Sequence, residues 1–141
     1  MSTVTPTATL PRATLARRGA VAIALSVVAN ALVLAVVLAS GAVQPFAPLS
    51  YPPVVLFSAL GALGAVLVYA ILSSRVENPD RTFTRVAAAV LVVSFVPDIG
   101  LLFGDPLATV PGVVVLMVMH AIVAGICVGT LTRVGRAPEV V

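Results

Sequence analysis

The sequence contains no lysine and no tryptophan, one cysteine and one histidine, and only 9% of its residues are charged. The single cysteine, Cys127, excludes an intrachain disulfide and any metal site built from several cysteines. The chain also lacks CxxC, HExxH, GxSxG and P-loop motifs. These absences remove common sequence signs of redox, metal-dependent, hydrolytic and nucleotide-driven enzymes. We therefore predict a protein without enzymatic activity, with no catalytic residues, no metal and no cofactor.

Apolar residues make up 60% of the 141-residue chain, more than a soluble domain of this size can bury. Four apolar stretches each reach the roughly 20 residues that a helix needs to cross a bilayer core. None alternates polar and apolar residues as a membrane β-strand does. The sequence thus predicts an all-α, four-helix transmembrane bundle in the cell membrane, with spans at about 19–40, 53–73, 83–103 and 111–132.

Two short segments flank this predicted helical domain of residues 19–132. Residues 1–18 are expected to form a disordered cytoplasmic N-terminal tail, and residues 133–141 a short cytoplasmic C-terminal tail. A cleaved signal peptide is an alternative for segment 19–40, which follows Arg17-Arg18. Its apolar run is longer than the roughly 7–15 residues of a signal peptide core, so we predict a retained span.

The basic residues predict the orientation of the chain. All eight are arginines, and they lie before the first span, around the second loop and after the fourth span: Arg12, Arg17, Arg18, Arg75, Arg81, Arg85, Arg133 and Arg136. The loops 41–52 and 104–110 contain none. The positive-inside rule therefore makes both termini cytoplasmic, and it places Tyr69 and Phe83 near the inner membrane interface. The arginines are too few and too scattered to predict a nucleic acid partner.

Small residues recur at a spacing of four in two spans. Ala121, Gly125 and Gly129 form one stripe in the fourth span, and Gly61 and Ala65 belong to another in the second. Helices in lipid associate mainly where small residues let their backbones approach. The stripes predict packing within the bundle, with a second copy or another membrane protein as the alternative partner.

Three polar residues lie inside the predicted spans and form a candidate intramembrane site. At 1.5 Å per residue, Asn30 lies about 17 Å into the first span, His120 about 13 Å into the fourth, and Asp98 about 7 Å from the outer end of the third. Ionisable residues at such depths are costly and often functional. Pro97 removes one backbone donor, so we expect a kink or an end of the third helix there.

Every arginine lies on the other side of the membrane, so Asp98 must be hydrated at the outer mouth, protonated, or paired with His120, and three arrangements are considered. The sequence favours a hydrated Asp98 in a short turn, with the helix ending at Pro97. The second alternative is a structural pair with His120, in which Asn30 takes part. The third is a pair that changes protonation during transport or gating, since an unperturbed imidazole titrates near pH 6.5.

The four arginine-bracketed spans, Pro97-Asp98 and Met119-His120 resemble a family of small prokaryotic four-span membrane proteins of unknown function, over about residues 15–133. The resemblance implies a membrane fold and no activity. Our first hypothesis is a non-enzymatic structural or accessory module that packs through its small-residue faces in the lipid bilayer. The alternative is a small transporter or channel with a pH-sensitive Asp98/His120 site. A dimeric haem or pigment binder through His120 is a third hypothesis.

Overall fold

The computed structural model describes residues 11–132, which form four helices and no strand: α1 (Arg12–Ser40), α2 (Tyr51–Arg75), α3 (Pro79–Gly104) and α4 (Val110–Leu131). Each helix is long and apolar enough to cross a membrane. The all-α class and the four candidate spans predicted from the sequence are confirmed. Residues 12–18, which we assigned to a disordered tail, instead form the first turns of α1. The rest of the two predicted tails lies outside the described residues.

Proline and glycine mark the helix boundaries. Each of α2, α3 and α4 has proline in its first turn, where the missing N–H costs no hydrogen bond. The side chain of Thr109 accepts a hydrogen bond from the backbone N–H of Gly112 at 3.3 Å and so caps α4. Gly41 ends α1 with φ of 66°, a left-handed conformation that glycine adopts without strain.

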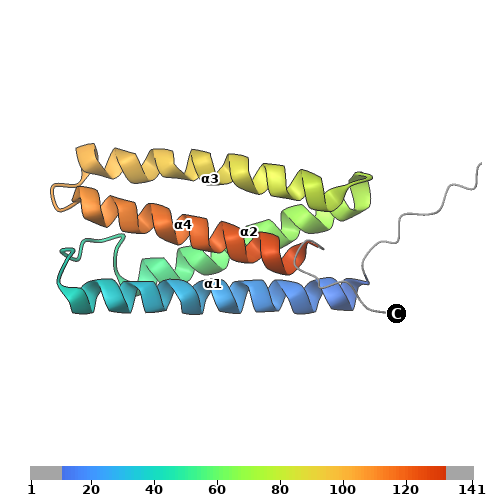
Figure 1. Ribbon diagram of the computed structural model, residues 1–141, viewed down its shortest axis with the longest axis horizontal. Helices are drawn as coiled ribbons and strands as arrows, with labels where there is room; N and C mark the ends of the chain where they lie inside the picture. Colours follow the sequence, from blue (N-terminus) through green and yellow to red (C-terminus); the bar gives the residue numbers. More distant parts are fainter. Residues whose placement is uncertain (1–10, 133–141) are drawn as a thin grey trace, which may run out of the picture.

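Helices that follow one another in the chain run antiparallel (Figure 1). The α1 helix packs closely on α2 and α4, and α3 packs mainly on α4, while contacts between α2 and α3 are sparser. Many large apolar side chains point outward, including Leu32, Phe57 and Val93. Exposed apolar area on this scale fits a surface that faces lipid.

Buried side chains form two clusters along the helix axes. The first includes Leu34, Val54, Leu116 and Met119, and loop 41–50 completes it with Val43, Phe46 and Leu49. The second includes Ala22, Ala62, Tyr69, Phe83, Cys127 and Leu131. Along α1, Asn30 lies between the residues of the two clusters, and His120 holds the same place on α4. The polar residues of the candidate site therefore lie in a layer between two apolar clusters.

Tyr69 and Phe83, which we expect near the inner membrane interface, have their side chains in the buried core. Each is 1% exposed, and their rings meet edge to face with centroids 5.2 Å apart. The Tyr69 hydroxyl donates a 2.6 Å hydrogen bond to Oδ1 of Asp80. The ring contact with Phe83 and the hydrogen bond to Asp80 both join Tyr69, near the end of α2, to the start of α3.

Candidate functional site

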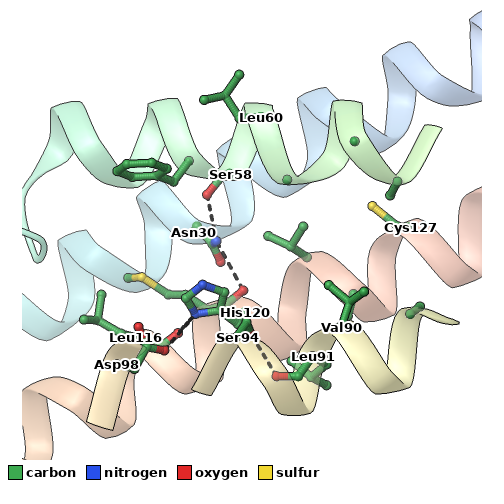
Figure 2. Close-up of a pocket in the computed structure, with 18 of the residues that line it drawn as sticks. Asn30, Ser58, Leu60, Val90, Leu91, Ser94, Asp98, Leu116, His120 and Cys127 are labelled. Atoms are coloured by element: carbon green, nitrogen blue, oxygen red, sulfur yellow. Dashed lines mark hydrogen bonds and ion pairs between the residues drawn. The ribbon is translucent and has the colours of Figure 1, made fainter. Parts of the chain in front are cut away.

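Asn30 joins three helices at the middle of the structure. Its Nδ2 donates to Oγ of Ser58 in α2 at 2.8 Å and to the backbone carbonyl of Met119 in α4 at 3.3 Å (Figure 2). Both hydrogens of the amide are thereby used. Asn30 is 2% exposed, and its Oδ1 is buried with no hydrogen-bond partner in the described part of the chain. Ser58 and the Met119 carbonyl were not among the predicted site residues.

Asp98 and His120 meet between α3 and α4. Oδ2 of Asp98 lies 3.0 Å from Nδ1 of His120, and the same nitrogen lies 2.9 Å from the backbone carbonyl of Leu116 (Figure 2). The contact with Oδ2 has the distance of an ion pair, but this buried oxygen makes no well-oriented hydrogen bond to any described residue. The Leu116 carbonyl is therefore the better aligned acceptor for Nδ1.

The structure differs here from the alternative that the sequence favoured. The α3 helix continues through Pro97 to Gly104, so Asp98 lies in the helix and not in a turn beyond it. Its side chain is only 8% exposed, whereas that of His120 is 42% exposed. Asp98 is thus buried beside His120 and not at a hydrated helix end. Asn30 contacts neither side chain by a hydrogen bond and remains a separate polar junction.

A cavity of about 930 Å³ follows the sparse seam between α2 and α3, with α4 as its floor. Such a volume lies within the roughly 300–1,000 Å³ of small-molecule sites. Asn30, Ser58, Asp98 and His120 supply polar groups to a wall that is otherwise mostly apolar. Its rim includes exposed apolar side chains such as Phe57, Leu60 and Val90, so the cavity opens sideways at an apolar surface.

The predicted packing residues separate into two groups. Gly61 and Ala65 line the cavity, and a Cβ added to Gly61 would be 3.7 Å from Cγ1 of Val123. Ala121, Gly125 and Gly129 are exposed on α4, and a Cβ at either glycine would meet nothing within 4 Å. The α4 stripe therefore does not pack inside the protein as we favoured. Its face is open to a partner.

The side chains in residues 11–132 provide no group of three or more histidine, cysteine, aspartate or glutamate residues that could hold a metal. Asp98 and His120 form a pair only. Cys127 is buried in the second apolar cluster. The chemistry that the site offers is hydrogen bonding and a single carboxylate–imidazole contact beside an apolar cavity.

The chain belongs to the family of unknown function DUF6069, whose model matches residues 10–137. This agrees with the resemblance to a family of unknown function noted from the sequence. No curated protein and no solved structure matches the chain. The family membership therefore brings no activity, and the function must be argued from the site.

Proposed function

We propose that this member of the DUF6069 family is a non-enzymatic, multi-pass membrane protein that binds a lipophilic molecule in the cavity between α2 and α3. The observation that carries the proposal is the cavity itself: a mostly apolar wall contains a few polar side chains, among them Asn30, Ser58 and His120. Small-molecule sites have this make-up, with a mostly apolar wall and a few polar groups that orient the ligand. The lateral opening lets such a molecule enter from lipid.

This proposal develops the hypothesis of a small transporter or channel centred on Asp98 and His120, because binding is the first step of transport. The proposed location is the cell membrane, with both termini cytoplasmic. All described arginines lie at the end of the protein where α1 begins and α2 joins α3, including Arg18, Arg75 and Arg81. Basic residues on one side of a membrane protein favour that side as cytoplasmic.

Methionine methyl groups provide a direct test of binding. Met119 lines the cavity and Met117 does not, so ¹³C-methyl labelling gives a reporter and an internal control in one sample. Titration of the protein in nanodiscs with dodecane should shift the Met119 signal saturably and leave Met117 unchanged. Gly64 lines the cavity with open space beyond its Cα, so Gly64→Leu should fill the space and abolish the shift.

The matched control is Gly100→Leu. A Cβ at Gly100 also meets nothing within 4 Å, but this residue does not line the cavity. The Gly100→Leu protein should therefore respond to dodecane like the unmodified one. Unsaturable shifts of both methyl signals, or an unchanged response of Gly64→Leu, would show that the probe only dissolves in the surrounding lipid, and would contradict the proposal.

A structural or accessory module is the second candidate, and one observation favours it. The stripe of Ala121, Gly125 and Gly129 is exposed on α4, with no side chain of the described chain against the two glycines. Close helix packing in membranes uses such small residues. Under this candidate, α4 binds a second copy of the chain, or a helix of another membrane protein.

A further inference from the structure

We infer that the molecule in the cavity carries a neutral carbonyl oxygen, which accepts a hydrogen bond from Nε2 of His120. This inference rests on the proposed function, because it names the head group of the molecule that the cavity holds. It follows from the position of the imidazole between two acceptors on one side and the cavity on the other. The ligand class is a lipophilic ketone, ester or amide.

The surroundings of Nδ1 place a hydrogen on that nitrogen. A backbone carbonyl can only accept, and the Leu116 carbonyl lies 2.9 Å from Nδ1. Oδ2 of Asp98, 3.0 Å away, is a second acceptor on the same side of the ring. An unprotonated Nδ1 would direct its lone pair at both oxygens. The ring therefore donates from Nδ1, and Nε2 becomes the atom that decides its charge.

We take the ring in its charged form, because Oδ2 of Asp98 lies within ion-pair distance of Nδ1. Asp98 is buried, and the arginines of the described chain lie at the opposite helix ends. The elements around the pair bring no other ionisable group close to it: α1 and α2 contribute Asn30 and Ser58, and Cys127 lies two turns further along α4. The charged pair and its neutral form, with the proton on Asp98, both lack net charge, and the Nε2 resonance measured below distinguishes them. In the charged form, His120 carries a hydrogen on Nε2 as well.

The Nε2–H group has no acceptor among the described residues, and it belongs to a side chain that is 42% exposed and lines the cavity. Figure 2 shows this nitrogen on the side of the ring away from Asp98. A charged N–H donor in a mostly apolar cavity requires an acceptor. A carbonyl oxygen satisfies it and keeps the site neutral, whereas a carboxylate would add a second negative charge to the apolar wall.

The single histidine of the chain makes the test specific, because ¹⁵N-histidine labelling reports only His120. The protein in nanodiscs is titrated with 2-dodecanone, and with dodecane and dodecanoate as matched probes. We expect 2-dodecanone to shift the Nε2 resonance saturably, over the same concentrations that shift the Met119 methyl. Dodecane should shift Met119 alone, and dodecanoate should shift neither at those concentrations.

Asp98→Asn supplies the second arm, because asparagine keeps the shape and an acceptor but removes the charge that holds the imidazolium. This variant should bind 2-dodecanone about tenfold more weakly or worse, as expected for loss of a charged hydrogen bond, and dodecane unchanged. Asp105→Asn removes a carboxylate from the end of α3 outside the cavity and should leave both affinities unaltered. A variant that fails to fold would lose dodecane binding as well. Unchanged dodecane binding therefore shows that only head-group recognition is lost.

The outcomes separate the two proposals. If dodecane and 2-dodecanone shift Met119 alike and Nε2 does not respond, the head-group inference is overturned and the proposed function stands. An equal response of Nε2 to dodecanoate would overturn the neutral class in the same way. If no probe shifts Met119, both the proposed function and the inference drawn from it fail.

Discussion

Oδ2 of Asp98 lies 3.0 Å from Nδ1 of His120, and this contact ties the second half of α3 to the middle of α4. A second polar contact, the hydrogen bond from Tyr69 to Asp80, holds the start of α3 to α2. The cavity lies along the seam between α2 and α3. The α3 helix is thus fixed by polar contacts at its start and in its second half, beside a seam that is sparsely packed.

The first prediction concerns the energy of the Asp98–His120 contact. Asp98→Asn and His120→Gln should each lower the free energy of unfolding by about 1–3 kcal/mol, the range for breaking a hydrogen bond that involves a charged or buried group. The double variant should lose less than the sum, with a coupling of about 0.5 kcal/mol or more. Denaturation in mixed micelles followed by far-ultraviolet circular dichroism measures this cycle. Strict additivity would mean that the two side chains do not interact.

A second prediction concerns the polar junction at Asn30. Ser58→Ala removes the acceptor of the 2.8 Å hydrogen bond between α1 and α2, and should cost roughly 0.6–1.7 kcal/mol, as for other interhelical bonds in membranes. Ser94→Ala is the matched control, because Ser94 donates at 2.7 Å to Leu91 in its own helix. The same unfolding assay should place Ser94→Ala within about 0.5 kcal/mol of the unmodified protein. A larger cost for Ser94→Ala than for Ser58→Ala would contradict this assignment.

Close packing of loop 41–50 against α4 provides a third prediction. A Cβ at Gly112 would lie 2.8 Å from Cε1 of Phe46 and 3.3 Å from Cγ1 of Val43. Gly112→Ala should therefore destabilise the protein by about 1–3 kcal/mol through overpacking. Gly100→Ala meets nothing within 4 Å, so higher helix propensity should make it neutral or more stable by up to about 1 kcal/mol. Equal stability of the two variants would show that loop 41–50 does not pack on α4 as described.

The extent of the four helices was largely predictable, whereas the direction of their faces was not. Length, hydropathy and the prolines at helix starts locate α2, α3 and α4 to within a few residues. These helices are apolar all round, so no polar face indicates which side turns inward. For this reason the sequence could not show that Gly125 faces outward, or that Tyr69 and Phe83 turn into the core.

The sequence could predict the candidate site only through the depth of each polar residue along its span. Counting residues along the spans placed Asp98 and His120 about one helical turn apart, so their pairing was among the alternatives considered. The sequence favoured a helix end at Pro97, because proline removes a backbone hydrogen bond. Lipid-facing helices tolerate proline when other groups satisfy the backbone, and α3 continues past it. The cavity depends on the separation of α2 from α3, which no local pattern encodes.

The proposed orientation gives a fourth prediction. Cys127, the native cysteine, is buried, so single cysteines introduced at exposed loop positions are expected to dominate labelling. Gln44→Cys should react with a membrane-impermeant maleimide in intact cells, and Glu77→Cys only after permeabilisation. Both positions are exposed, and they lie in the loops after α1 and after α2. Labelling of Glu77→Cys but not Gln44→Cys in intact cells would place the termini outside and overturn the proposed orientation.

The last prediction tests the exposed stripe on α4. Gly125→Leu places a large side chain where a Cβ meets nothing within 4 Å, so the protein should keep its fold. If α4 binds a second copy through this stripe, energy transfer between donor- and acceptor-labelled protein in liposomes should fall to the level of random proximity. Gly100→Leu adds the same side chain to α3, where it also meets nothing, and should leave the transfer unchanged. Equal transfer in both variants would exclude self-association through the stripe, and α4 would then bind another membrane protein or only lipid.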